Sequence, residues 1–574
     1  MKKKIITFML TLAVLSCDKN FTDVPLKGTL NSASLATEQG VDLLLIGAYS
    51  MLDGFRYGLS QDYRSSGDNW WFDVVADDAH KGADNGDQNE LYLLEHYDWT
   101  TGNPWIKDEW IGPFAGVNRA NAVMAQAALV EGADLTRQIA EARFLRGHFN
   151  FELQRTFRNI PFLTENDLLN PNKPNNGPIW GDVEADFQFA IDNLPESQAQ
   201  VGRANRWAAK AYMGKVLLYQ KKWAPAASIL QDVINNGPYE LNAEYVDNFN
   251  LAGKNASESV FAIQFLNDAG ESFNGNRGGT LNHPAGGPLN TCCGFYQPSQ
   301  DLVNAFQTNG SGLPLLDTWN QTDVKNDQGV PSYKTDANGT VLYDGAGNPI
   351  PTDFTVHAGP LDPRLDYTVG RRDLNFNGWG RNPGSAWVRV QSAGGPYIAS
   401  KATYRADETE AKGNGGAWGQ ARPGINYNII RYADVLLMAA EALVETNNLA
   451  TALDYVNQVR NRAKNMTYVP TVSGVNPTNY DVEPYPTFPD QTYARKAIRF
   501  ERRIEFGMEG HRLFDLMRWE VLPSVINTYF PNEERTIPNI NTGAQAQSKH
   551  LVFPIPLDAI DLSRGVLQQN PEWK

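Results

Sequence analysis

Two adjacent tryptophans lie between acidic residues in the segment 68–73, whose sequence is Asp-Asn-Trp-Trp-Phe-Asp. Sugar rings carry C–H patches on their faces and hydroxyls at their edges, so a carbohydrate site needs aromatic platforms with polar groups around them. Trp70, Trp71 and Asp73 are therefore the first candidate for a binding platform. The alternative is that the rings cap a helical core, and because adjacent side chains point in different directions we expect at least one to be buried.

A second candidate group lies in a loop rich in Gly and Pro, where Cys292 and Cys293 are adjacent and Tyr296 follows closely. In an oxidising compartment the two cysteines either form a vicinal disulfide that stiffens the loop or remain two small buried side chains. A stiffened backbone would present the Tyr296 ring to a ligand. Packing within the loop is the alternative role of all three residues.

A third candidate group combines two guanidinium groups with two aromatic rings further along the chain. Its members are Arg371, Arg372, Trp379 and Tyr397. A guanidinium donates hydrogen bonds to vicinal hydroxyls or to a carboxylate-bearing sugar, and an aromatic ring stacks on the sugar face. As for the second group, loop packing or solvent exposure is the alternative.

The sequence contains weaker indications of a metal site or of acid–base catalysis than of ligand binding. The adjacent cysteines lie outside any spacing that binds zinc. The acidic cluster that contains Glu505, Glu509 and Asp515 includes His511, but there is no second His four residues away and no HExxH motif. No EF-hand pattern occurs, although the Asp-rich turn at 84–87 offers oxygen atoms to an adventitious calcium ion. We therefore predict no cofactor and no metal.

The N-terminus has the features of a secretion signal. Three lysines precede an apolar run over residues 5–15, and Ser16 and Cys17 follow it. The segment 14–17 resembles a bacterial lipobox, although Leu15 replaces the usual small residue, so residues 1–16 are a predicted signal peptide and Cys17 a predicted lipidation site. A cleaved signal with an incidental Cys is the alternative. The apolar run is too short to span about 30 Å of hydrocarbon as a permanent helix.

The composition restricts the class of partner. With 574 residues the chain exceeds the roughly 250–300 residues that one core supports, so a large composite fold is expected. The net charge of −15 repels phosphate backbones and argues against nucleic acid. The 14 tryptophans are more than a purely structural protein needs and favour a neutral ligand that stacks on rings.

Helical periodicity dominates the two ends of the chain. Apolar residues at spacings of three and four predict a helix over 40–51 and an antiparallel helical hairpin over 110–129 and 136–157. Residues 207–236 and 434–460 resemble two tetratricopeptide helix-turn-helix units. Such repeats need about three stacked units to bury their apolar faces, and the hairpin is the expected third.

Between these helical parts the pattern breaks into clusters of Gly, Pro, Asn and Asp over residues 265–424, which indicates loops and short strands. Irregular stretches of this length are usually functional. We therefore predict a mainly α fold with one composite domain over 17–574. Helical repeats occupy about 36–264 and 425–525, a loop-rich binding part about 265–424, and a C-terminal tail 526–574.

Four ordered motifs carry a family resemblance. They occupy residues 426–442, 502–519, 553–571 and 362–365, and they include the stretches NYNIIRYADVLLM, EGHRLFDLMRW and FPIP. Together with the lipobox they resemble the SusD/RagB family of outer-membrane nutrient-binding lipoproteins. Within the second motif, Glu509, Arg512, Asp515 and Arg518 alternate in charge at three-residue steps, which predicts a helical face that locks neighbouring helices.

The resemblance implies a lipid-anchored lipoprotein on the cell surface, attached to the outer membrane through Cys17. It implies a tetratricopeptide-like half facing a SusC-like TonB-dependent transporter and an irregular half that presents the ligand groove. The implied function is to capture oligosaccharide or polysaccharide and deliver it to the transporter, with no catalysis.

Three alternatives stay open. Some relatives in the family capture peptides, and a peptide groove would favour backbone hydrogen bonds over exposed rings. A glycoside hydrolase would need two carboxylates about 5–10 Å apart across an aromatic cleft. A tetratricopeptide scaffold that binds only proteins is the third. The sequence does not indicate which glycan is bound.

Overall fold

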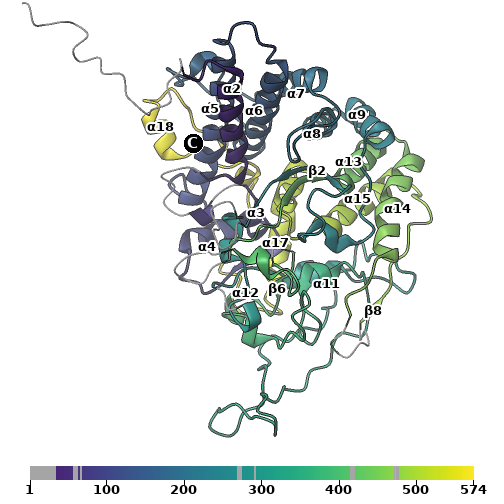
Figure 1. The fold of residues 1–574 in the computed structure, drawn as a ribbon. Helices are drawn as coiled ribbons and strands as arrows, with labels where there is room; N and C mark the ends of the chain where they lie inside the picture. Colours follow the sequence, from purple (N-terminus) through teal and green to yellow (C-terminus); the bar gives the residue numbers. More distant parts are fainter. Residues whose placement is uncertain are drawn as a thin grey trace, which may run out of the picture.

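The computed structural model describes residues 34–55, 62–64, 67–267, 275–289, 292–401, 403–413, 421–470, 472 and 478–574. Within these ranges the chain is mainly helical with a few short strands (Figure 1). The predicted signal peptide and Cys17 lie outside the described residues. None of the helices in the described ranges is long and apolar enough to cross a membrane.

The N-terminal helices form the predicted hairpin. Helix α2 (Glu38–Tyr49) packs against α5 (Pro104–Ala127), and α5 packs against α6 (Thr136–Phe157). Helix α5 begins where Asn103 accepts a hydrogen bond from the backbone N–H of Trp105, six residues before the predicted start. A Cβ atom on Gly116 would lie 2.5 Å from the Phe149 ring, so glycine is what allows the two helices to approach closely.

Both predicted repeats are helical pairs. Residues 207–236 form α8 (Arg206–Tyr219) and α9 (Trp223–Asn236), and residues 434–460 form α13 (Tyr432–Glu445) and α14 (Leu449–Asn465). Helix α7 (Trp180–Asn193) connects α6 to α8, and α15 (Gln491–Phe506) packs on α13. Because α9 packs directly on α13, helices from distant parts of the chain form one continuous arc (Figure 1).

The strands are short and paired two by two. Two of the ladders are β1 (Ala79–Gly82) with β3 (Phe295–Pro298) and β2 (Ser259–Ile263) with β7 (Tyr427–Arg431), both antiparallel. Two-residue ladders pair β4 (Pro360–Leu361) with β8 (Asn479–Tyr480) and β5 (Val369–Gly370) with β6 (Ile398–Ala399). The β2–β7 ladder lies at the boundary of the loop-rich part, whose two ends therefore lie side by side.

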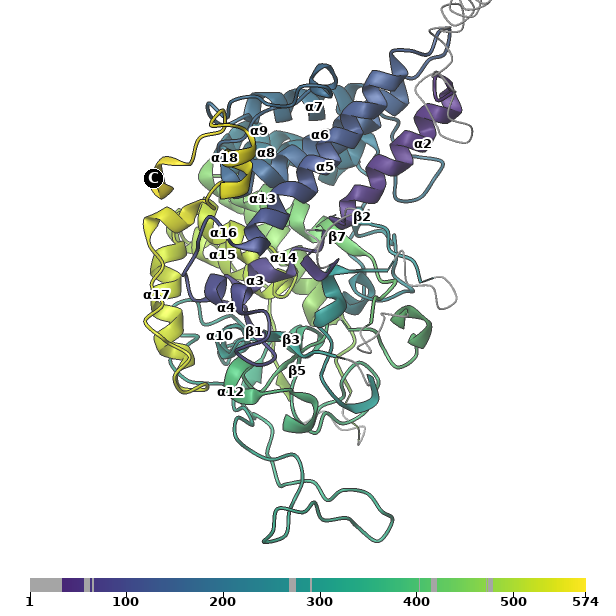
Figure 2. The same cartoon turned by 90° about the vertical axis from the view of Figure 1, so that its left-hand side faces the viewer.

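The loop-rich part between residues 265 and 424 is confirmed as mostly irregular. Its described residues include the short α-helices α10 (Gln300–Ala305), α11 (Leu365–Thr368) and α12 (Gln391–Gly394). Residues 333–351, paired by isolated bridges, project from the body at the bottom of Figure 2. The other short helices are α3 (Trp70–Val74), α4 (Asn89–Glu95), α16 (Arg512–Arg518), α17 (Leu522–Glu533) and α18 (Leu557–Leu562).

The C-terminal segment belongs to the core. The boundary predicted at residue 525 falls inside α17. Further on, Phe553 and Ile555 are completely buried, and the Phe553 ring stacks on Trp99 with centroids 4.2 Å apart. Asn570 donates hydrogen bonds to the carbonyls of Phe157 and Phe553, so the chain end is tied to α6.

A network of buried charges joins the sequence motifs. Arg431, at the end of β7, is 1% exposed and forms ion pairs with Glu258, Glu505 and Glu509. Arg364, in the motif at 362–365, also contacts Glu505, at 2.8 Å. These contacts connect the helical repeats to the loop-rich part. We call this group the buried charge network; its members are Glu258, Asp362, Arg364, Arg431, Arg460, Arg462, Glu501, Glu505 and Glu509.

The prediction that Glu509, Arg512, Asp515 and Arg518 lie on one helical face is wrong. Gly510 has a φ of +75° and separates Glu509 from α16, so Glu509 does not share a helix with Arg512, Asp515 and Arg518. The charges still connect different elements, as predicted. Their partners are Arg431 and Lys401 for Glu509, Asp77 for Arg512, Arg502 and Arg518 for Asp515, and Glu441 for Arg518.

Because of His80, the stability of the fold is expected to fall at alkaline pH. It is fully buried on β1, with Nδ1 3.0 Å from Glu95 and Nε2 2.9 Å from Glu533. Burial alone lowers the pKa of His80, but the hydrogen bonds to Glu533 and Glu95 outweigh it and raise the pKa to about 9. A raised pKa contributes stability that is full below about pH 6.5 and is lost as the pH rises through about 9.

We therefore expect the free energy of unfolding to fall by about 2 kcal/mol between pH 7 and pH 9 from this residue alone. Denaturant titrations of the wild type and of H80Q across this range measure the effect, since the variant has no charge to lose. A difference between the two proteins that stays constant with pH would contradict the assignment.

Candidate binding site

Residues 281–289 and 292–296 contribute to the linings of two cavities. The larger one, here called the disulfide cavity, has a volume of about 520 Å³, within the usual range of small-molecule sites. It lies next to the β1–β3 ladder, and it collects residues from four distant parts of the chain. Its lining residues are Tyr63, Asp87, Gln88, Leu281, Ala285, Cys292, Cys293 and Arg389.

Cys292 and Cys293 form a disulfide with each other, so the first of the two alternatives for this pair is the correct one. Cys293 is 5% exposed, whereas Cys292 is half-buried. The following residue is fixed by the backbone, because the N–H of Ala83 donates to the carbonyl of Gly294 at 2.7 Å. The disulfide is thus a small apolar surface held at a fixed place in the cavity wall.

Arg389 supplies the positive charge of the disulfide cavity. Its guanidinium donates to Asp87 at 2.7 Å, to Asp84 at 2.5 Å and to the carbonyl of Cys293 at 3.4 Å. The side chain remains 33% exposed, so a ligand can reach it. The same contacts show that the Asp-rich turn at 84–87, considered for calcium, binds a guanidinium. In the described residues there is no group of three or more His, Cys, Asp or Glu that could hold a metal ion.

Tyr63 and Gln88 supply neutral hydrogen-bonding groups to the disulfide cavity. The amide of Gln88 donates to the Tyr63 hydroxyl at 2.8 Å, and the ring of Tyr63 packs near Trp105 with centroids 6.2 Å apart. Burial raises the pKa of Tyr63. The phenol therefore stays protonated and can donate a hydrogen bond to a ligand.

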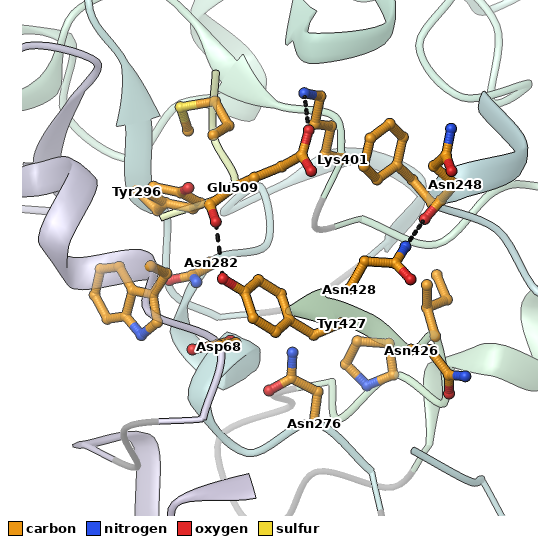
Figure 3. A pocket seen from close by; sticks show the side chains of 15 residues that line it. Asp68, Asn248, Asn276, Asn282, Tyr296, Lys401, Asn426, Tyr427, Asn428 and Glu509 are labelled. Atoms are coloured by element: carbon orange, nitrogen blue, oxygen red, sulfur yellow. Dashed lines mark hydrogen bonds and ion pairs between the residues drawn. The ribbon is translucent and has the colours of Figure 1, made fainter. Parts of the chain in front are cut away.

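The smaller cavity, here called the inner cavity, has a volume of about 70 Å³ and is partly open (Figure 3). Most of its polar groups are paired: Asn428 donates to the carbonyl of Asn248, and the Tyr427 hydroxyl donates to the carbonyl of Glu509. Lys401 donates to Glu509 at 2.8 Å, and burial lowers the pKa of Lys401 to about 8. The other lining residues are Asp68, Trp70, Phe249, Asn276, Asn282, Tyr296, Pro423, Ile425, Asn426 and Met508.

The first predicted group is in the core. Trp70 and Trp71 are 2% and 1% exposed; Trp70 meets Trp105 edge to face, and Trp71 stacks on the neighbouring Phe72 with centroids 3.9 Å apart. Asp73 is fully buried and accepts a hydrogen bond from Tyr296 at 2.7 Å. The prediction that at least one ring is buried is confirmed, but neither ring forms an open platform. Trp70 lines the inner cavity.

The second group is divided between the cavities, because Cys292 and Cys293 line the disulfide cavity and Tyr296 lines the inner one. The Tyr296 ring is 2% exposed and meets Trp70 edge to face, so the loop does not present it to solvent. Burial raises the pKa of Tyr296 well above its ordinary value. Its phenol therefore donates to Asp73 and holds that carboxylate in the core.

The third group does not form one site, because its polar atoms bind other parts of the protein. Arg371 forms two hydrogen bonds with Asp366 at 2.7 and 2.8 Å, and Arg372 donates to backbone carbonyls such as that of Thr352 at 3.0 Å. The Tyr397 hydroxyl donates to Gln300 at 2.9 Å, and the half-buried Trp379 donates through Nε1 to the carbonyl of Tyr404 at 3.2 Å. Both guanidinium groups are almost completely buried.

The geometry adds Tyr63, Gln88 and Arg389 to the candidate residues. None of them belongs to a motif, and nothing in the spacing of residues 63, 88 and 389 connects them. In the sequence, Asp87 stands out only as part of the Asp-rich turn at 84–87. The contacts of Arg389 with Asp84 and Asp87 are what bring the turn into the cavity.

The family model for the SusD family matches residues 257–573. The chain belongs to the SusD family. The matched residues include all four motifs, which confirms the predicted resemblance. SusD-like protein P25 of Formosa agariphila is 25% identical over 99% of this chain and 98% of its own length, so the similarity extends to the N-terminal helices outside the family model.

Solved structures of SusD proteins share the fold. A SusD superfamily protein from Bacteroides vulgatus superposes with a TM-score of 0.66 at 20% identity, over 93% of this chain and 99% of its own. Surface glycan-binding protein A from Bacteroides thetaiotaomicron, in complex with laminarihexaose, gives a TM-score of 0.65 at 18% identity over 93% and 99% of the two chains. The mainly α architecture predicted from periodicity is therefore that of the SusD family.

Proposed function

We propose that this SusD family member is a cell-surface lipoprotein that binds oligosaccharide or polysaccharide in the disulfide cavity. It delivers the saccharide to a SusC-like TonB-dependent transporter and is anchored in the outer membrane through Cys17. The observation that carries the proposal is the lining of the disulfide cavity, which combines an apolar disulfide with a guanidinium, a carboxylate and a phenol. A glycan-binding relative of the same fold supports the choice of ligand.

Each part of the cavity suits one part of a sugar. The disulfide and Leu281 offer apolar contact to C–H patches, and the Tyr63 phenol offers a donor. Arg389 offers donors to vicinal hydroxyls, and Asp87 accepts from them. Asp87 is the one carboxylate among the described lining residues, and it is paired with Arg389. Hydrolysis of a glycosidic bond needs two carboxylates facing each other, so we infer binding without catalysis.

Calorimetry on the soluble chain that begins after Cys17 tests the proposal. The probes are gluco-, fructo-, galacto- and xylo-oligosaccharides of equal length and a mixed peptide pool. We expect saturable heat from at least one saccharide and none from the peptides. Heat from the peptides alone would reject the saccharide assignment, and release of reducing sugar that one Asp or Glu substitution abolishes would reject the absence of catalysis.

The anchor and the transporter need separate measurements in cells. Cys17→Ala is expected to move the protein from the membrane fraction to the soluble fraction, because it removes the thiol to which the acyl chain would be attached. Affinity purification of the wild type is expected to recover a barrel transporter. Membrane retention of the C17A protein would contradict the anchor.

Opening the disulfide is expected to weaken saccharide binding about 3- to 10-fold. The loop keeps its backbone hydrogen bond from Ala83 to Gly294, so the wall loosens without collapsing. Calorimetry of the wild type with and without reductant measures the loss. The double variant C292S/C293S is the control, and its affinity should not respond to reductant. An unchanged affinity of the reduced wild type would show that the disulfide is not part of the site.

A further inference from the structure

Four buried polar atoms of residues that line the inner cavity have no hydrogen-bond partner within the described residues. They are Nδ2 and Oδ1 of Asn282, Nε1 of Trp70 and Oδ1 of Asp68. Asn282 and Trp70 are each 2% exposed and Asp68 is 7% exposed. Asp68 and Asn282 lie at the same end of the cavity in Figure 3, away from Asn248 and Asn426.

The unpaired atoms contrast with the rest of the same cavity. Asn426 accepts from the N–H of Phe265 and donates to Gln264, and Asn428 is paired on both side-chain atoms. Leaving a buried polar atom unpaired costs about 1–3 kcal/mol, and proteins leave very few of them. Four such atoms on the lining of one cavity can be satisfied by a polar group from outside the chain.

The size of the inner cavity limits that group. A cavity of about 150 Å³ holds a benzene ring, so a cavity of about 70 Å³ has room for a few waters or one hydroxymethyl group. A sugar ring is too large for it. Because the cavity is partly open, a ring can remain outside while a substituent enters.

We propose that this end of the inner cavity is a subsite for the exocyclic hydroxymethyl group of a hexose. One hydroxyl oxygen accepts two hydrogen bonds and donates one. Trp70 Nε1–H and the Asn282 amide are the donors, and Asp68 is the acceptor. The subsite rests on the proposed function and adds a preference for hexoses over pentoses. Pentopyranoses such as xylose have no exocyclic hydroxymethyl group.

Two variants remove the subsite without opening a hole in the core. Asn282→Leu replaces the unpaired amide with an apolar group of similar size, so we expect the variant to fold with equal or greater stability. Asp68→Asn keeps the shape of the side chain and replaces its unpaired carboxylate oxygen with an amide. Arg389→Ala, in the disulfide cavity, is the matched variant for the proposed function.

Calorimetry with hexose and pentose oligosaccharides of equal length tests the subsite. We expect the wild type to bind its preferred hexose ligand about tenfold more tightly than the matched xylo-oligosaccharide, and both N282L and D68N to lose that preference. Saccharide binding that R389A weakens while N282L and D68N leave it unchanged would overturn the subsite and keep the proposed function. Absence of binding to any saccharide by the wild type would overturn both.

Crystals soaked with the preferred saccharide give a second measurement that does not depend on either variant folding. A hydroxymethyl group within hydrogen-bond distance of Asn282 and Asp68 is the expected result. Two ordered waters in the inner cavity, with the saccharide bound elsewhere, would overturn the subsite.

Discussion

Replacing Arg431 with methionine is expected to lower the free energy of unfolding by about 3–5 kcal/mol, a large part of the roughly 5–15 kcal/mol that is typical of native proteins. Arg431 is 1% exposed and binds three buried carboxylates, those of Glu258, Glu505 and Glu509. Burial alone would raise the pKa of Glu505, but Arg462, Arg431 and Arg364 hold that pKa well below its ordinary value. The methionine fills most of the volume but leaves these carboxylates with less positive charge than they need.

Denaturant titration of R431M against the wild type measures the loss. The control is K464M, which removes the exposed ion pair between Lys464 and Glu483, where both side chains are more than 40% exposed. Exposed pairs contribute about 0–1 kcal/mol, so K464M should be almost as stable as the wild type. Equal stability losses in R431M and K464M would mean that the buried charge network does not hold the two halves of the fold together.

Replacing Arg389 with alanine is expected to weaken saccharide binding roughly 100-fold, equivalent to about 2.7 kcal/mol. The variant removes the cavity's donors to vicinal hydroxyls. It also leaves Asp84 and Asp87 without their cation, so two negative charges face each other at the cavity wall. Since the guanidinium is 33% exposed, the fold should lose little stability.

Calorimetry and thermal denaturation of R389A, side by side, separate the two effects. Arg381→Ala is the matched control, because Arg381 is also partly exposed, at 38%, and paired with one aspartate, Asp373, outside the disulfide cavity. We expect R381A to bind as the wild type does. Equal affinities of R389A and the wild type would remove the disulfide cavity from the binding site.

The helical part of the fold was predictable because its periodicity is local. The hairpin of α5 and α6 and the pairs α8–α9 and α13–α14 each appear as apolar residues three and four apart. The helix bounds differ by a few residues, most at Asn103, where a capping side chain and a proline begin α5 six residues before the apolar pattern.

The candidate site was predictable only in part. Cys292 and Cys293 were found because two adjacent cysteines are visible in any sequence. Arg389 was missed because its role comes from contacts with residues about 300 positions away, which no local pattern records. Trp70 and Trp71 were misplaced as a platform because a tryptophan buried in a core and one exposed at a site look the same in sequence.

The β2–β7 ladder bears on how SusD proteins diverge. Because the chain leaves and rejoins the helical arc through two strands that pair with each other, the ends of the intervening loops are already held together. Each doubling of a loop's length then adds only about 0.6 kcal/mol of closure entropy. Insertions and deletions between these strands can therefore reshape the cavity walls at small thermodynamic cost. Different ligands can then be bound while the helical arc stays unchanged.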